Sequence, residues 1–273
     1  PTSTTYDPIM ASKAVRKISL TGSTAIGQQM IRDSAATLKR VSMELGGNAP
    51  VLVFEDANVD QVLDLSVPVK FANAGQVCVT ADRFYVHESL QKAFAEGFVA
   101  RAKALKLGHG LDETSQMGPL INQRRVDAME AIVADAKSRG GKINAGGGRP
   151  AGQNKGFFFE PTVITGLPDD ARAMAEENFG PIAAITGFAS ADEAYARANS
   201  SEYGLAAYVF TRNPTRMREA AARLESGMVG VNSYALAAAE APFGGIKASG
   251  MGREGGSEGI LDYMNVKLTQ VVV

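Results

Sequence analysis

Short apolar runs alternate with segments of helical periodicity along most of the chain. The run APVLVF (residues 49–54) is apolar throughout, which is typical of a strand buried on both faces of a parallel sheet. The segment at residues 88–105 instead places Leu90, Phe94 and Phe98 on one helical face. Because strands and helices keep alternating, we predict an α/β fold with a mostly parallel sheet flanked by helices.

Three local signals refine this prediction. Asn58 is a suitable N-cap for a helix that runs toward Gly75, and Pro68 inside that helix predicts a kink or a break. Residues 140–156 are rich in glycine and turn residues, which predicts a surface loop.

Composition excludes several classes of function. The single cysteine rules out a disulfide framework and favours a reducing compartment, so we expect a cytoplasmic protein. The formal net charge is −1, with acids and bases spread along the chain, so we expect no nucleic-acid partner and no membrane patch. No apolar run approaches the roughly 18 residues of a membrane span. We also predict no metal site.

The lone cysteine, Cys78, lies in the stretch FANAGQVCVT at residues 71–80. Unpaired cysteines are mostly buried and inert, so a small buried hydrophobe is one interpretation. A nucleophile is the other, because Gly75 and Gln76 leave room for a substrate and the Cys78 N–H is placed to hold an oxyanion. As a nucleophile, Cys78 is expected to react with iodoacetamide faster than a free-thiol peptide at neutral pH. His87 and His109 are expected to be surface or capping residues, which disfavours a cysteine–histidine hydrolase.

Glu44 ends an apolar strand in MELGGN, residues 43–48. A carboxyl group among apolar neighbours has a raised pKa and suits a general base, whereas an ordinary strand-end glutamate would face water. A third candidate is the turn GSTAIG, Gly22–Gly27, between a strand and a helix. Its free N–H groups, with the hydroxyl of Ser23, could bind an anion, although a plain helix start explains the same residues.

Together these residues resemble the aldehyde dehydrogenase superfamily. MELGGN is similar to the glutamate motif of that family, and FANAGQVC to its cysteine motif, 78 − 44 = 34 positions later. EENFGP at residues 176–181 and PFGGIKASGMGRE at residues 242–254 resemble two further family motifs, and GSTAIG resembles a fifth.

The resemblance implies a chemical role for each motif. Cys78 would attack the aldehyde to form a thiohemiacetal, and hydride transfer to NAD or NADP would leave a thioester. Glu44 would activate the water that hydrolyses the thioester. The residues implied in cofactor binding are Gly22, Ser23, Gly27, Leu45, Glu177 and Phe179.

The resemblance also implies a domain organisation. Family members are nearly twice as long, so the N-terminal part of the Rossmann-like cofactor domain is expected to be missing. We divide the chain into a remnant of the NAD(P)-binding domain (residues 1–46), a catalytic domain (residues 47–246) and a C-terminal segment (residues 247–273). The last segment would carry an oligomerisation strand, KLTQVVV, which implies a homo-oligomer.

The C-terminal motif most resembles the succinate-semialdehyde dehydrogenase branch, which implies a small aldehyde such as succinate semialdehyde as substrate. Ala72 stands where that branch often has arginine, and Thr80 where it often has a second cysteine. Two other interpretations stay open at this stage: a non-catalytic oligomerisation fragment, and a thiol esterase that uses Cys78 and Glu44. The shortened chain is also expected to be inactive alone as a dehydrogenase.

Overall fold

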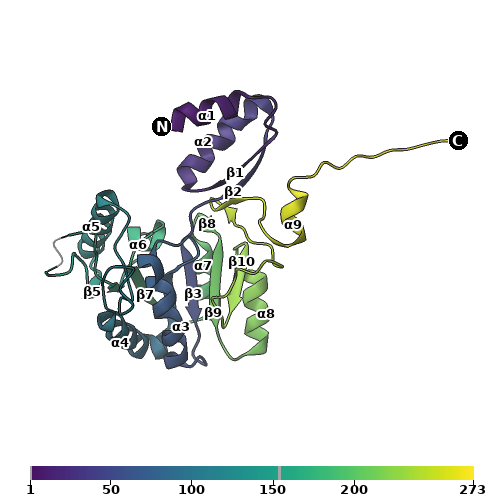
Figure 1. Ribbon diagram of the computed structural model, residues 1–273. Coiled ribbons are helices and arrows are strands. Elements are labelled where there is room, and N and C mark those ends of the chain that lie inside the picture. The colour runs from purple at the N-terminus through teal and green to yellow at the C-terminus, as the bar shows by residue number, and fades with distance from the viewer. Residues whose placement is uncertain (1, 153–154) are drawn as a thin grey trace.

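The structure is a computed structural model that describes residues 2–152 and 155–273, and Figure 1 shows how its elements are arranged. The helices are α1 (Thr2–Ala11), α2 (Thr24–Ser34), α3 (Val59–Phe71), α4 (Glu88–Ala104), α5 (Gln123–Ser138), α6 (Arg172–Ala175), α7 (Ala191–Asn199), α8 (Pro214–Arg223) and α9 (Gly256–Leu261). The strands are β1 (Lys17–Thr21), β2 (Arg40–Glu44), β3 (Ala49–Val53), β4 (Ala81–His87), β5 (Lys142–Ala145), β6 (Thr162–Thr165), β7 (Ile182–Phe188), β8 (Tyr203–Gly204), β9 (Ala206–Phe210), β10 (Met228–Val231), β11 (Ile246–Lys247) and β12 (Gly250–Met251).

A seven-stranded sheet forms the larger part of the molecule, in the order β10-β9-β3-β4-β7-β6-β5. Neighbouring strands are parallel except for β5, which runs antiparallel to β6. Helices α3 and α4 pack on each other and against β4, and α7 packs against β3 and β7. The prediction of an α/β fold with a mostly parallel sheet is therefore confirmed.

The apolar patterns explain why these elements form. All five residues of β3 are buried, as expected for a central parallel strand. In α4, Phe94 and Phe98 are buried and stack edge-to-face or tilted around Phe84 of β4. The Asn58 side chain accepts a hydrogen bond from the Gln61 N–H at 3.1 Å, so the predicted N-cap of α3 is confirmed.

Two local predictions were wrong. Helix α3 continues through Pro68 to Phe71 without a break. Pro68 lies in the last turn, so its ring removes a single backbone hydrogen bond, and burial of Val67 and Phe71 on the sheet holds the helix together. The predicted surface loop at residues 140–156 contains β5, because Ile143 pairs with Ile164 at the sheet edge; residues 153 and 154 lie outside the described residues.

A small sheet in the order β1-β2-β12 lies beside the main one. Strands β1 and β2 are parallel, and β12 pairs antiparallel with the end of β2, where Gly250 lies opposite Glu44. The chain therefore returns more than two hundred residues after β2 to complete this sheet. Figure 1 shows α1, α2 and the small sheet together above the main sheet.

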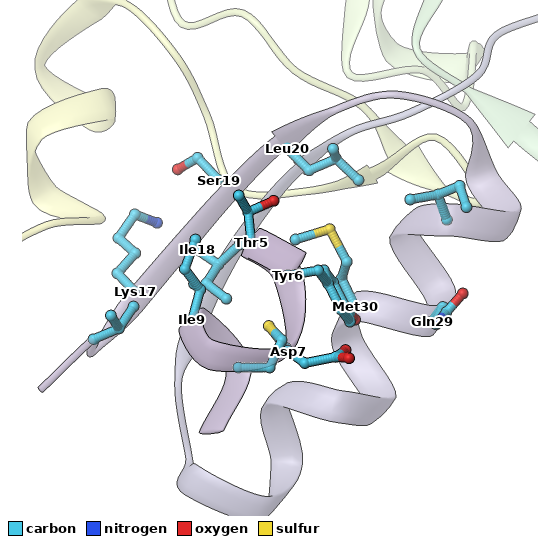
Figure 2. A pocket seen from close by; sticks show the side chains of 13 residues that line it. Thr5, Tyr6, Asp7, Ile9, Lys17, Ile18, Ser19, Leu20, Gln29 and Met30 are labelled. Carbon is cyan, nitrogen blue, oxygen red and sulfur yellow. The ribbon is translucent and has the colours of Figure 1, made fainter. Parts of the chain in front are cut away.

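Helices α1 and α2 lie over one face of β1 and enclose a cavity of about 640 Å³, shown in Figure 2. Its lining is mostly apolar and includes Met10, Ile18, Leu20 and Met30. Helix α1 was not predicted from the sequence. Within residues 2–152 and 155–273, only β2 pairs with β1, so the other edge of β1 carries no strand.

The C-terminal tail runs away from the rest of the molecule (Figure 1). It forms no strand within the chain, and Val266 and Leu268 are 101% and 90% exposed. A strand that pairs with another subunit has no partner in a single chain, so the predicted oligomerisation strand stays a prediction. None of the described helices has the length and apolarity needed to cross a membrane.

Candidate active site

A cavity of about 490 Å³ lies where the small sheet meets the loops at one end of the main sheet. Its lining includes every predicted site residue except Gly27. The lining residues are Thr21, Gly22, Ser23, Glu44, Leu45, Gln76, Val77, Cys78, Arg125, Glu177 and Phe179. Four sequence motifs that are far apart in the chain therefore meet at one cavity.

The loop that carries Cys78 has an unusual backbone. After α3 ends, Asn73, Ala74 and Gly75 are all left-handed, with φ of 50°, 55° and 71°. A Cβ on Gly75 would lie 2.1 Å from the carbonyl oxygen of Gly180, so only glycine fits there. Gln76 anchors the loop, because its Nε2 donates to the Asn73 carbonyl at 2.9 Å and its Oε1 accepts from the Ile121 N–H at 2.9 Å.

The thiol of Cys78 is half-buried, and its surroundings oppose ionisation. Burial raises the pKa of Cys78, and the negative charges of Glu177 and Glu44 raise it further. The backbone N–H groups of Cys78 and Val79 act in the other direction, because they stabilise the thiolate. Iodoacetamide reacts with the thiolate, so the structure does not support labelling faster than a free thiol at neutral pH.

Glu44 ends β2 with its side chain turned inward. Its residue is 5% exposed, and its Oε2 is buried without a hydrogen-bond partner in the described part of the chain. Burial raises the pKa of Glu44 to about 7; the charge of Glu254 adds to the rise and that of Arg253 opposes it. The prediction of a carboxyl group with a raised pKa is confirmed, and such a group can exchange protons near neutral pH.

Two glycines after Glu44 bring another carboxylate close. The Gly47 N–H donates to Glu177 Oε1 at 3.1 Å, and a Cβ on Gly46 would lie 2.6 Å from Glu177 Oε2. Burial raises the pKa of Glu177, while the Gly47 N–H and the charge of Arg125 oppose the rise. Phe179 follows with a left-handed φ of 43°, which turns this loop sharply at the cavity wall.

Only the first residues of the Gly22–Gly27 turn, Gly22 and Ser23, line the cavity. Ser23 lines the cavity and is the N-cap of α2, but it makes no side-chain cap bond, and the first N–H groups of a helix have no partner within the helix. Gly27 is instead buried against Leu45, since a Cβ there would lie 2.4 Å from a Leu45 methyl group. Gly27 therefore lets α2 approach the strand end, and Leu45 forms the cavity wall between them.

Sequence reasoning missed Arg125, on the first turn of α5. Its Nη2 donates to the Asn178 carbonyl at 3.0 Å, and its Nε is buried without a hydrogen-bond partner in the described residues. Burial lowers the pKa of Arg125, and the nearby charge of Glu177 opposes this. The position follows no motif, so no local signal distinguishes it from a surface arginine.

The two histidines have structural roles, as predicted. His87 is the N-cap of α4 and accepts from the Ser89 N–H, and His109 accepts from the Leu111 N–H at 3.1 Å. No group of three or more histidine, cysteine, aspartate or glutamate side chains within the described ranges could hold a metal ion. The cavity therefore brings together a thiol, a buried carboxyl group with a pKa of about 7 and the first residues of a helix.

Comparison with known proteins agrees with this geometry. A model of the aldehyde dehydrogenase family matches residues 1–269. The chain belongs to the aldehyde dehydrogenase family. A probable succinate-semialdehyde dehydrogenase [NADP(+)] of Sinorhizobium fredii is 45% identical over 93% of this chain and 51% of its own. A 3-sulfolactaldehyde dehydrogenase of Pseudomonas putida is 46% identical over 93% of this chain and 52% of its own.

The fold is shared with solved family members. Betaine aldehyde dehydrogenase of Staphylococcus aureus, solved in complex with NAD+, superposes with a TM-score of 0.91 at 36% identity, over 94% of this chain and 51% of the other. The chain thus spans about half the length of the relatives that it matches.

The buried carboxyl group of Glu44 generates a prediction for stability. Its folded pKa of about 7 lies above the unfolded value of 4.5, so the folded chain binds an extra proton between these values and loses stability as the pH rises through this window. Wild type should therefore lose about 1–3 kcal/mol more unfolding free energy than Glu44→Gln when the pH is raised from 5 to 8.5, because glutamine does not ionise. Urea denaturation at both pH values measures this difference, with exposed Glu96→Gln as the control. An equal effect of Glu44→Gln at both pH values would contradict the raised pKa.

The contact of Gly75 with Gly180 generates a second prediction. Gly75 and Gly166 have similar left-handed φ values of 71° and 75°, but nothing lies within 4 Å of a Cβ on Gly166. Gly166→Ala should cost about 1–2 kcal/mol through its backbone alone. Gly75→Ala should cost at least about 2 kcal/mol more, because the methyl group also meets a carbonyl oxygen. Equal costs in urea denaturation would show that the two loops separate freely.

Proposed function

We propose that the cavity is the catalytic site of an NAD- or NADP-dependent aldehyde dehydrogenase, which oxidises an aldehyde to a carboxylic acid. The observation that carries this proposal is the convergence of Cys78, Glu44 and Glu177 on one cavity. Family membership makes aldehyde oxidation the expected reaction, and these three residues are the groups that we propose carry it out.

The residues present fit a dinucleotide cofactor. The uncapped start of α2 at Ser23 offers N–H groups to a pyrophosphate, and Gly22 has no side chain to block its approach. Glu177 offers carboxylate oxygens to ribose hydroxyls, and the buried Nε of Arg125 lacks an acceptor. We propose Gly22, Ser23, Leu45, Glu177 and Phe179 as cofactor contacts, with Gly27 holding the turn in place.

The chemistry proceeds on the sulfur of Cys78. The Sγ atom attacks the aldehyde carbon as its proton passes to the Glu44 carboxylate, which then releases it to solvent, and the Cys78 N–H donates to the developing oxyanion. A nicotinamide cofactor held by Glu177 and Phe179 would supply the hydride acceptor, and loss of hydride from the thiohemiacetal would leave a thioester on Sγ. Glu44 then takes a proton from water, whose oxygen attacks the thioester carbon, and the acid and the free thiol are released.

The substrate belongs in this proposal to the small aldehydes, with a semialdehyde such as succinate semialdehyde as the first choice. Relatives named for succinate semialdehyde and 3-sulfolactaldehyde support an aldehyde with a second, anionic group. Ala72 offers no charge for such a group, and Lys70 is held by Asp82 at 2.6 Å. Arg125 is the cation that lines the cavity in the described structure.

The domain assignment is part of the same proposal. Residues 1–46 would belong to the cofactor domain, residues 47–246 to the catalytic domain and residues 247–273 to a segment that ends in the oligomerisation strand. We further propose a homo-oligomer in the cytoplasm. The fully exposed valines of the tail support the assembly, because apolar side chains of this kind are buried when a second chain pairs with them.

The first test measures what the chain does alone. The chain spans about half the length of its relatives, so we expect no measurable reduction of NAD or NADP with succinate semialdehyde. Cys78 and Glu44 share the cavity, so we expect slow hydrolysis of an activated ester that is lost in Cys78→Ala. Its rate should fall as the pH drops through about 7, because Glu44 then becomes protonated. If wild type and Cys78→Ala hydrolyse the ester at the same rate, Cys78 is not the nucleophile. If wild type but not Cys78→Ala reduces the cofactor, the prediction that the isolated chain is inactive as a dehydrogenase is wrong.

The second test concerns assembly. Removal of residues 266–273 deletes Val266, Leu268 and the terminal valines, which are exposed in the single chain. The shortened chain should shift toward monomer in light scattering, because the tail would otherwise pair with a neighbouring sheet. A matched variant with Val271→Ser and Val272→Ser should shift partly. An unchanged mass in both variants would contradict the oligomerisation strand.

A further inference from the structure

The ion pair between Lys70 and Asp82 takes no part in the reaction described above. Its Nζ–Oδ1 distance is 2.6 Å, and the side chains are 0% and 2% exposed. In every other ion pair of the described residues, both side chains are at least 17% exposed. Burying two charges is costly, and an apolar pair of similar size stabilises a fold equally well. Because stability alone does not explain the Lys70–Asp82 pair, its position in the fold can indicate its role.

The pair closes the base of the loop that carries Cys78. Lys70 is the next-to-last residue of α3, and Asp82 is the second residue of β4. The left-handed residues 73–75 and Cys78 lie between them. A second bond crosses the same base, because Thr80 Oγ1 donates to the Val69 carbonyl at 3.2 Å. The two ends of the loop are thus joined just below the thiol.

Asp82 also reaches the loop that carries Glu177 and Phe179. The side-chain amide of Asn178 stabilises the Asp82 carboxylate, and the charge of Asp82 raises the pKa of Glu177. Asn178 is fully buried, and its Nδ2 also donates to the Ala173 carbonyl at 3.0 Å. One buried carboxylate therefore pairs with the end of α3, at the base of the Cys78 loop, and interacts electrostatically with the loop that carries Glu177.

We propose that Lys70 and Asp82 are positioning residues, which hold the Cys78 loop in a fixed place relative to Glu177 and Phe179. This inference rests on the proposed role of Cys78 as the nucleophile. The pair does not touch the reacting atoms. It acts by joining the two ends of the loop, so that the backbone N–H groups of Cys78 and Val79, which favour the thiolate, stay in place.

The test removes both charges without removing volume. Lys70→Met leaves Asp82 unpaired and Asp82→Asn leaves Lys70 unpaired, so each single variant should melt at a lower temperature than wild type. The double variant Lys70→Met/Asp82→Asn contains no unpaired charge and should recover most of that loss. Its Cys78 should nevertheless react with iodoacetamide about tenfold more slowly at pH 8, with the rate profile displaced upward by about one pH unit.

The matched control neutralises a surface pair on the same helix. Arg101 Nη2 lies 2.9 Å from Asp64 Oδ1 between α4 and α3, and Arg101→Met/Asp64→Asn uses the same substitutions. This control should keep the wild-type alkylation profile. Hydrogen exchange should rise at residues 72–80 and 176–181 together in the double variant, but not in the control. Asp82→Glu is a second probe, because it keeps the charge pair and displaces the carboxylate by one methylene; it should slow alkylation about threefold.

The outcomes separate this inference from the proposed function. A double variant, or Asp82→Glu, with wild-type melting and a wild-type alkylation profile would refute the positioning role alone. A wild-type chain whose Cys78 reacts only after denaturation would refute the nucleophile and, with it, the role of the pair. A slowed profile at recovered stability would support positioning, since a purely structural pair would restore both properties together.

Discussion

The backbone of Gly75 lies against the carbonyl group of Gly180, and the shape of the cavity depends on that contact. A Cβ on Gly75 would lie 2.1 Å from the oxygen. Gly47 makes a similar approach, because its Cβ would lie 2.3 Å from the Cys78 carbonyl oxygen. The loops that carry Cys78, Glu44 and Glu177 therefore meet backbone to backbone. Side chains on either glycine would push the loops apart, and the functional groups would separate with them.

This close approach has an electrostatic consequence. Three groups that can carry negative charge, Cys78, Glu44 and Glu177, line one cavity, and burial raises the pKa of each. The charges of Glu177 and Glu44 favour the neutral form of the thiol, while burial and the charge of Glu254 favour the neutral form of Glu44. A positive charge bound in the cavity would oppose these effects, because it favours the ionised forms. The oxidised nicotinamide ring carries such a charge, so the electrostatics agree with the proposed cofactor and with a thiol that ionises less readily without it.

The sequence predicted the central strands and most of the cavity lining, but not everything around them. Long apolar runs such as residues 49–54 specify buried strands directly, and the glycine-rich motifs mark places where backbones approach closely. Arg125 was missed because an arginine on an amphipathic helix gives no local signal of a cavity. The thiol was expected to be activated, since its motif does not show that Glu177 and Glu44 converge on it. Pro68 and β5 were misjudged because packing on the sheet overrides weak local preferences.

The C-terminal glycine-rich motif explains why the residues around Gly22 and Glu44 could not by themselves predict how this side of the cavity is held together. Ser249 is fully buried, and its hydroxyl donates to the Gly46 carbonyl at 2.6 Å and accepts from the Gly204 N–H at 3.0 Å. The Ser249 carbonyl accepts from the Leu45 N–H, and the neighbouring Ala248 carbonyl accepts from the Thr24 hydroxyl at the start of α2. Residues 248 and 249 thus join the Gly22–Gly27 turn, the Glu44 strand end and the short strand β8. The C-terminal motif therefore holds the Gly22–Gly27 turn beside the end of the Glu44 strand, although it lies more than two hundred residues after that turn.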